Sequence, residues 1–501
     1  MTSGLKFQTW FSVLLTTLSA MLMGYDVGII SGAILFIVEE MKLSVWKEEM
    51  IIGSLNVVAA FSAIAAGFFA NRYGRKRTLE MAAFVFFAGA VLLAAAPGFI
   101  CLMAGRVLTG VGVGFAMMIA PLYSAEISPA KIRGFLVSFT EIFVDVGIVL
   151  GYIFGFAFQF LNPAYNWRLM LGVSGIPAVV LFFGTAMALP ESPRWLVMQG
   201  FYEEALEVLE RTVCAEGGDA KEKLAEIMNA NEVESEKSAG CSDDGRDRRP
   251  FNPTNIFRSQ ACRGLAKTYV AAIGVNFIQQ ATGIEATVYY SPMIFKVAGV
   301  HSRLGMLGAT LCVGVVKLGF VLVATSTLDR IGRKTLLIAS SIGMIASLLV
   351  ICATFKINGI NIDASSSSAN LHDNNVALIT VVSICAYVAF FSIGWGPIAY
   401  VFSAEIFPLK HRSKALGCSM FVNRIVSGAV AFSFLTISQA ITLTGTFSVF
   451  CVVTVISIIF TVFLIPETKG KSLEELAEEC ATVPTPPRSS TSSDINCPLL
   501  S

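Results

Sequence analysis

Long apolar runs dominate the chain, and each is close to the length that a membrane-spanning helix needs. A helix of about 20 mostly apolar residues crosses the hydrocarbon core of a bilayer. Six such runs precede a polar stretch from about Pro190 to Arg263, and six more follow it. They start near Trp10, Met50, Thr78, Ile100, Gly134 and Arg168, and then near Leu265, Leu304, Thr335, Ala377, Ser413 and Ile441. The pattern predicts an all-α membrane protein with 12 transmembrane helices in two six-helix bundles.

The polar stretches divide the chain into four parts. We expect a first bundle over 1–189, a central loop over 190–264, a second bundle over 265–466 and a tail over 467–501. Within the loop, acidic and apolar residues at helical spacing predict a short helix from Phe201 to Arg211 and a second around Ala220 to Val233. The tail is rich in Pro, Ser and Thr after residue 483, so we expect it to be largely disordered there.

Basic residues in short loops predict the orientation of the chain in the membrane. They gather after the second, fourth, eighth and tenth runs, for example at Arg75, Lys131, Arg333 and Lys410, whereas the loops after the third and eleventh runs carry almost none. Short cytoplasmic loops are enriched in Lys and Arg. We therefore expect the lipid bilayer around the bundles, both termini and the central loop in the cytoplasm, and the plasma membrane as the location.

Composition excludes several classes of protein. The chain is 55% hydrophobic and 14% charged, against about 25% charged in soluble domains. A net charge of +1 argues against a nucleic-acid partner, which requires a concentrated basic face. The three histidines are far apart, so a histidine-built metal or catalytic site is not expected. We see no pairing of a nucleophile with a base and no phosphate-binding loop, and we expect no enzyme activity, no metal and no cofactor.

Three short motifs recur in the two halves, each at the same end of the corresponding helix. In order, 71–76 matches 329–334, 123–129 matches 402–408, and 190–192 matches 466–468. Parallel repeats of this kind are typical of transporters built from two bundles, with the substrate at the midplane between them.

The recurring motifs predict a cytoplasmic gate. Gly74 and Gly332 allow tight turns, and the neighbouring Arg side chains can reach Glu126 and Glu405. Such ion pairs would hold the cytoplasmic side closed in one state and break in the other. The alternative is that the basic residues are ordinary membrane anchors, but this does not explain the matching Glu in both halves. The gate candidates are Arg72, Gly74, Arg75, Glu126, Arg133, Glu191, Asp329, Arg330, Gly332, Arg333, Glu405, Arg412 and Glu467.

Charged residues inside the apolar runs are candidates for function, because each costs a few kcal/mol to insert. Asp26 lies in the first run and Arg106 in the fourth. Glu141, Asp145 and Ile148 are spaced to share one face of the fifth helix.

Glu285, Lys317 and Arg424 complete a charged set in the second half. We expect Lys317 to pair with Glu285, and Arg424 to pair with a carboxylate of the fifth helix. Gly283 should let the seventh helix break beside the substrate cavity that we expect between the bundles. Backbone N–H and C=O groups left without a helical partner at the break can then line that cavity.

These motifs resemble the sugar porter branch of the major facilitator superfamily, over nearly the whole chain from Gly24 to Gly470. The residues that carry the resemblance are Gly105-Arg106, Pro190 to Arg194, Gln279-Gln280 with Gly283-Ile284, Gly396-Pro397 before Tyr400, and Pro466 to Gly470. One departure is Asn71, where the family usually has Asp. Within the branch the chain looks most like the plant polyol/monosaccharide proton symporters, through 139–143, 315–317 and 421–424.

The resemblance implies a role for each candidate residue. It implies that Asp26 takes up the proton with Arg106 as its partner, and that substrate contacts Gln279, Gln280, Tyr400 and Asn423, beside the charged residues named above. The function implied is symport of a proton with a small polyhydroxylated substrate, a polyol and possibly a monosaccharide, by a monomer using alternating access. The alternatives are a passive uniporter, in which Asp26 and Arg106 form a static ion pair, and a sugar sensor that does not transport.

Overall fold

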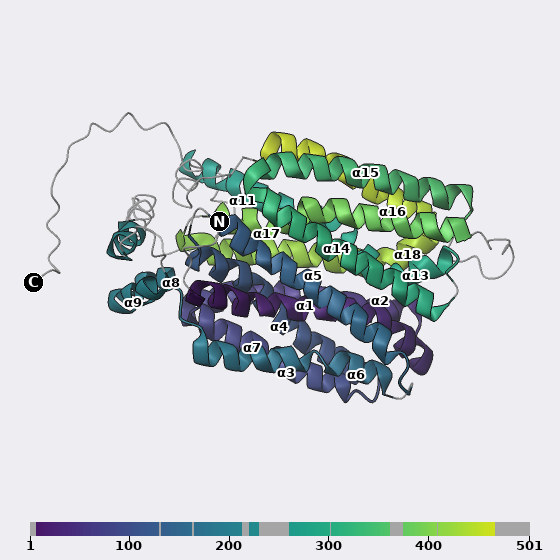
Figure 1. Cartoon of the computed structure of the whole chain (residues 1–501), viewed down its shortest axis with the longest axis horizontal. Coiled ribbons are helices and arrows are strands. Elements are labelled where there is room, and N and C mark those ends of the chain that lie inside the picture. Colours follow the sequence, from purple (N-terminus) through teal and green to yellow (C-terminus); the bar gives the residue numbers. More distant parts are fainter. Residues whose placement is uncertain are drawn as a thin grey trace, which may run out of the picture.

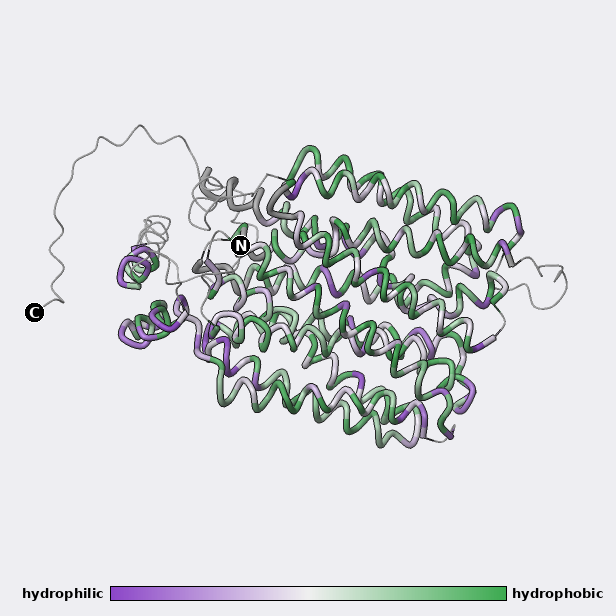
Figure 2. The backbone as a smooth tube through the Cα atoms, viewed as in Figure 1, coloured by the Kyte–Doolittle hydropathy of each residue, from purple (hydrophilic) through white to green (hydrophobic). Residues whose placement is uncertain are grey.

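The structure is a computed structural model that describes residues 7–129, 132–162, 165–212, 220–229, 260–300, 302–360, 374–407 and 409–465. Of residues 133, 260–268, 328–330, 374, 404–405 and 409–414 it describes only the backbone. Long helices run side by side along one direction, with the early helices on one side and the later helices on the other (Figure 1). Most residues along the length of these helices are hydrophobic (Figure 2), as the apolar runs predict.

The first half contains six spanning segments. The sixth is interrupted, because α6 and α7 are separated by Val173 and Ser174. The helices are α1 (Phe7–Met41), α2 (Val45–Tyr73), α3 (Arg75–Ala94), α4 (Phe99–Ile127), α5 (Arg133–Phe158), α6 (Asn166–Gly172) and α7 (Gly175–Ala188).

The second half repeats this plan with more interruptions. Its helices are α11 (Gln260–Ala281), α12 (Ile284–Tyr289), α13 (Ser291–Val297), α14 (Arg303–Ile331), α15 (Arg333–Ile357), α16 (Asn374–Ile393), α17 (Trp395–Glu405) and α18 (Leu409–Leu464). The last of these is two helices joined at Thr442, whose φ of 70° is not helical. Ten described segments are long and apolar enough to cross a membrane. With α18 counted as two helices and α11–α13 as one interrupted helix, the described chain matches the expected 12.

Two breaks shape the middle of the second half. Gly283 has a φ of 85°, a left-handed conformation that favours glycine, and it separates α11 from α12. This confirms the break expected there. A second break at Gly394 separates α16 from α17 and was not predicted.

Close packing of α1 against α5 fixes the geometry of the first half. A Cβ atom at Gly24 would lie 1.9 Å from the Val144 carbonyl oxygen, and one at Gly147 would lie 2.2 Å from the Met21 carbonyl oxygen. Only small residues allow two membrane helices to approach this closely. The contact therefore holds the charged residues of α1 and α5 at a fixed separation.

Two short helices, α8 (Pro193–Gln199) and α9 (Tyr202–Thr212), lie beyond one end of the spanning helices (Figure 1), which we call the loop end. Ser192 caps α8 by accepting from the Trp195 N–H, and Gly200 ends it in a left-handed conformation. The helix expected from Phe201 to Arg211 is confirmed by α9. Residues 220–229 are also helical, as expected. The tail lies outside the described residues, and the division of the chain at 189, 264 and 466 stays a prediction.

Candidate functional site

A cavity lies between the two halves, near the middle of the spanning helices. Its walls come from α1 and α5 in the first half and from α11, α12, α14, α16 and α17 in the second. The lining residues are Met23, Val27, Glu141, Val144, Ile148, Gln279, Gln280, Ile284, Glu285, Val288, Lys317, Phe391 and Tyr400. Seven of the ten residues that the sequence suggested for substrate binding therefore line one cavity.

A buried ionic cluster joins the halves on one side of the cavity. Lys317 on α14 contacts Asp145 Oδ1 and lies 3.3 Å from Glu141 Oε1, both on α5. The shared face of α5 is therefore confirmed, but the expected pairing of Lys317 with Glu285 is wrong. The physical reason is that α14 packs against α5, so that the ammonium group meets the α5 carboxylates before it can reach α12.

A second ion pair lies across the cavity. Arg424 Nη2 on α18 is 2.8 Å from Glu285 Oε1 on α12, and Ser427 donates a hydrogen bond to the same carboxylate. The expected pairing of Arg424 with a carboxylate of the fifth helix is therefore also wrong, because α18 packs against α12 and α2 rather than α5. Lys317 and Arg424 thus each pair with the carboxylates that were expected for the other.

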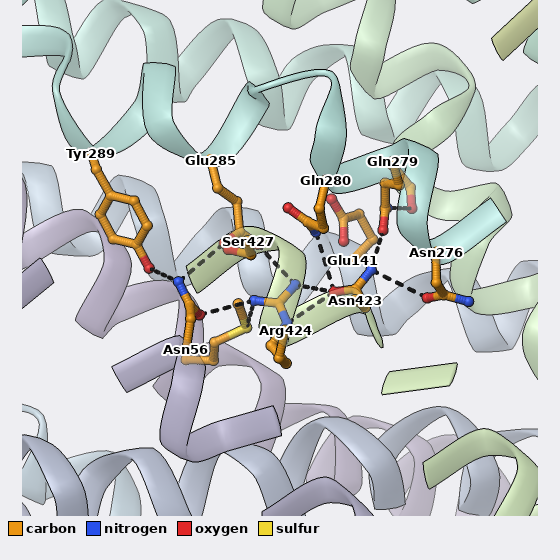
Figure 3. A network of polar contacts seen from close by, with 12 residues as sticks. Asn56, Glu141, Asn276, Gln279, Gln280, Glu285, Tyr289, Asn423, Arg424 and Ser427 are labelled. Atoms are coloured by element: carbon orange, nitrogen blue, oxygen red, sulfur yellow. Dashed lines mark hydrogen bonds and ion pairs between the residues drawn. The ribbon is translucent and has the colours of Figure 1, made fainter. Parts of the chain in front are cut away.

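Asn56 on α2 links this second pair to the first half (Figure 3). Its Nδ2 donates to the Tyr289 hydroxyl at 3.0 Å and to Glu285 Oε2 at 3.4 Å. Its Oδ1 accepts from Arg424 Nη1 at 3.4 Å. Asn56 is fully buried, and it is a polar residue within an apolar run, a signal that the sequence analysis overlooked.

A chain of amide side chains lines the second-half wall (Figure 3). Asn423 Nδ2 donates to Gln279 Oε1 at 2.7 Å, and Asn423 Oδ1 accepts from Gln280 Nε2 at 3.2 Å and from Arg424 Nε at 2.9 Å. Gln279 Nε2 also donates to the Trp395 carbonyl at 2.9 Å, beside the break at Gly394. Gln280 Oε1 is buried without a hydrogen-bond partner among the described residues. This atom is available to accept from a ligand in the cavity.

The Asp26–Arg106 pair lies just behind the cavity wall. Arg106 Nη1 contacts Asp26 Oδ2, and both side chains are buried. Arg106 Nε also donates to the Ile51 carbonyl of α2 at 3.0 Å. Met23, one helical turn before Asp26, lines the cavity and contacts Arg424 Nη1 through its sulfur at 3.8 Å. The expected pairing of Asp26 with Arg106 is therefore present.

At the loop end, a buried cluster connects α3, α4 and the segment before α8. Arg75 binds Glu126 through two hydrogen bonds, Nη2 to Oε1 at 2.7 Å and Nε to Oε2 at 2.9 Å. Ser192 Oγ donates to the same carboxylate at 2.5 Å. Glu191 accepts the Arg75 backbone N–H at 2.8 Å. Burial raises the pKa of Glu191, although these backbone donors act in the opposite direction.

Gly74 is required beside this cluster for two reasons. Its φ is 94°, and a Cβ atom there would lie 2.1 Å from Glu191 Oε2. Gly332 has the same conformation in the second half, with a φ of 102°. The expected tight turns at both glycines are confirmed.

The structure describes the remaining gate candidates unevenly. Arg72 is exposed and Arg333 is buried. The side chains of Arg133, Asp329, Arg330, Glu405 and Arg412, and all of Glu467, lie outside what the structure describes.

Comparison with known proteins defines the class. The family model for "Sugar (and other) transporter" matches residues 12–480. Two similar proteins are from Arabidopsis thaliana. The chain is 42% identical to probable polyol transporter 4 over 92% of this chain and 82% of that protein. It is 41% identical to polyol transporter 5 over 93% of this chain and 85% of that protein.

Solved structures of a bacterial symporter have the same fold. The proton:xylose symporter XylE of the major facilitator superfamily, bound to 6-bromo-6-deoxy-D-glucose, superimposes with a TM-score of 0.79 at 26% identity, over 94% of this chain and 98% of that one. Its inward-open form from E. coli gives a TM-score of 0.68 at 26% identity, over 94% and 99% of the two chains.

Two bundles of membrane helices with a polar cavity between interrupted helices define a secondary transporter. The chain belongs to the sugar transporter family of the major facilitator superfamily, and it is a membrane transporter rather than an enzyme.

Proposed function

We propose that this chain is a proton-coupled symporter of polyols, including sugar alcohols and cyclitols, that also accepts monosaccharides. The observation that carries the proposal is the buried Asp26–Arg106 pair directly behind a polar cavity between the two halves. Similarity to polyol transporters and to a proton:xylose symporter supports both the substrate class and the coupling.

The cavity suits hydroxyl groups, which both donate and accept hydrogen bonds. Gln280 Oε1 offers a buried free acceptor among the described residues. Glu141 and Tyr400 offer further polar groups to the cavity. Gln279, Asn423 and Ile148 complete the contact surface, with the two ion pairs holding its shape. We assign the substrate to this cavity.

Coupling follows from the Asp26–Arg106 pair. A nearby guanidinium favours the ionised carboxylate, and separating the two favours protonation. If substrate binds best when the pair is separated, proton and substrate favour each other's binding by the same factor. Two halves that move around the cavity provide the alternating access.

Orientation, location and the gate complete the proposal. The Lys and Arg of the short loops support a cytoplasmic loop end with both termini on that side, and we propose the plasma membrane as the location. One chain contains both halves and the cavity, so we propose that it works as a monomer. The Arg75–Glu126 cluster and its counterpart in the second half would form the cytoplasmic gate, each bracing the helix ends of its own half that meet when this side closes.

Accumulation of substrate in proteoliposomes tests the coupling. A panel of labelled polyols and hexoses is offered with and without a pH gradient across the membrane. A symporter of one proton accumulates its substrate up to about tenfold per pH unit. Asp26→Asn should equilibrate its substrate without accumulating it. Ser31→Ala is the control, since Ser31 is a buried residue of α1 whose hydroxyl donates to the Gly28 carbonyl of the same helix.

Three results would reject the proposal in different ways. Equal, gradient-independent uptake by the wild type would identify a passive uniporter. Accumulation by Asp26→Asn would remove Asp26 from the coupling step. Binding of polyols without any uptake would favour a sensor.

A further inference from the structure

The buried charges around the cavity are not balanced. In the described interior, Asp26 pairs with Arg106 and Glu285 pairs with Arg424, one carboxylate to one cation in each case. The cluster on the other flank has two carboxylates, Glu141 and Asp145, and one ammonium group, Lys317. With every group ionised, this third cluster would carry one uncompensated negative charge.

All three members of the cluster are withdrawn from solvent. The exposed fractions of the side chains are 6% for Lys317, 6% for Glu141 and 1% for Asp145. Asp145 Oδ2 is buried and has no hydrogen-bond partner among the described residues. An unpaired charge at such a depth costs several kcal/mol, and a carboxylate in this position takes up a proton instead.

In the described part of the chain, the helices packed against α5 supply no second cation to the cluster. Tyr152 on α5 and Tyr400 on α17 are neutral at physiological pH. Arg106 on α4 is bound to Asp26, and Arg424 on α18 is bound to Glu285. Arg168 on α6 pairs with Glu40 at the end of α1. Among the described groups that pack around α5, Lys317 alone offsets the two carboxylates.

We propose that Glu141, Asp145 and Lys317 form a second proton-binding site, in which the two carboxylates share one proton. One carboxyl group, one carboxylate and one ammonium then coexist, and the cluster is neutral. The proton belongs to the pair of carboxylates rather than to either one, because both contact the same Lys317 ammonium group. This site is separate from Asp26, and its existence does not depend on symport.

The consequence for binding does rest on the proposed function. Glu141 and Lys317 line the cavity, and they belong to different halves. The protonated cluster offers a substrate a carboxyl donor as well as a carboxylate acceptor. It also joins α5 to α14 without a net charge, so the two halves can approach each other at this flank without exposing an isolated carboxylate to the membrane.

Infrared difference spectroscopy of the purified protein tests the site directly. A protonated carboxyl group has a carbonyl stretch that a carboxylate lacks. The wild type should show this band at neutral pH and lose it as the pH is raised. Asp145→Asn and Glu141→Gln should each lose the band, because each leaves one carboxylate for one ammonium group. Lys317→Met should gain one further protonated carboxyl group.

Two control variants separate this site from packing and from Asp26. Thr140→Val alters a buried residue of α5 next to Glu141 and should keep the band. Asp26→Asn should also keep it. Each variant is first checked for a monodisperse peak on size-exclusion chromatography, and the two isosteric carboxamide variants provide independent tests if one of them does not fold.

Distinct results would overturn this inference. Absence of the band in the wild type at neutral pH would do so, as would its persistence in either carboxamide variant. Loss of the band only in Asp26→Asn would place the proton behind the cavity, which would reject the second site and leave the proposed symport intact. If the band is lost in the cluster variants and the wild type fails to accumulate substrate in proteoliposomes, the second proton site is supported and the proposed symport is rejected.

Discussion

The ionic cluster at the loop end and those around the cavity use the same residue types but join different parts of the molecule. Arg75 and Glu126 belong to the first half, and Glu191 and Ser192 to the segment that directly follows it. The two oxygens of Glu126 receive hydrogen bonds from a guanidinium and a hydroxyl. The cavity clusters reach across the halves, through Lys317 to α5 and through Asn56 to Glu285 and Arg424.

This difference separates two roles for buried charge. The contacts of the loop-end cluster brace helices of the first half against one another and need not break when the halves move. Contacts between halves contribute to the energy difference between transport states, since a rigid-body motion must stretch or preserve them. Breaking the first kind should mainly lower stability, and breaking the second kind should mainly change binding.

The largest effect is expected for Arg75→Met at the loop end. It leaves the Glu126 carboxylate buried without its cation, and removing one partner of a buried pair costs about 3–5 kcal/mol. Chemical unfolding in detergent micelles should show a loss of this size. Arg72→Met, at an exposed position three residues earlier, is the control and should stay within about 0.5 kcal/mol of the wild type.

A neutral double variant sharpens this test. Adding Glu126→Gln to Arg75→Met removes the unpaired buried carboxylate. The double variant should therefore be more stable than Arg75→Met alone, because the two neighbouring sites are coupled. If the single and double variants unfold alike, the charge on Glu126 is not what Arg75 compensates, and the loop-end cluster is not a brace of the first half.

An intermediate effect is expected for Asn56→Leu between the halves. The variant removes the hydrogen bonds of Asn56 to Tyr289, Glu285 and Arg424, and unsatisfied buried partners cost about 1–3 kcal/mol. Because these partners shape the cavity, polyol affinity should fall about tenfold, which corresponds to ~1.4 kcal/mol. Isothermal titration calorimetry of the purified protein measures it.

Ser54→Ala provides the matched control for Asn56→Leu. Ser54 lies on the same helix, and its hydroxyl bonds the Ile51 carbonyl of that helix. Its polyol affinity should match the wild type. An unchanged affinity in Asn56→Leu would show that the contact across the halves does not shape the cavity.

The apolar pattern was sufficient to predict the helices, and local rules were sufficient for the special turns. Runs of membrane length gave the spanning segments, and Gly74, Gly283 and Gly332 have the positive φ values that their positions required. The i, i+4, i+7 spacing placed Glu141, Asp145 and Ile148 on one face because a helix has a fixed period. These features depend on residues close together in the chain.

Partner choice could not be predicted in the same way. Lys317 and Arg424 were assigned to each other's carboxylates, because opposite charge alone does not say which helices are neighbours. The packing of α14 on α5 and of α18 on α12 decides the pairing, and that packing depends on side-chain shape along whole helices. Asn56 and Ser427 were missed for a related reason, since their roles appear only when helices distant in sequence meet.

The smallest effect is expected for Glu49→Gln, at the end of the molecule opposite the loop end. Glu49 on α2 is buried, and it accepts the Thr436 backbone N–H at 2.9 Å and the Thr436 hydroxyl at 2.8 Å across the halves. Glutamine keeps the shape and one acceptor oxygen but loses the charge. The free energy of unfolding should therefore fall by about 1 kcal/mol. A double-mutant cycle with Thr436→Val should give a coupling energy of similar size.

Glu48→Gln, at the less buried neighbouring position, should show no coupling to Thr436. If the Glu49 cycle is additive to within about 0.5 kcal/mol, the Thr436 hydroxyl adds nothing to the contact, and the distinction between contacts within one half and contacts between halves would rest on the cavity clusters alone.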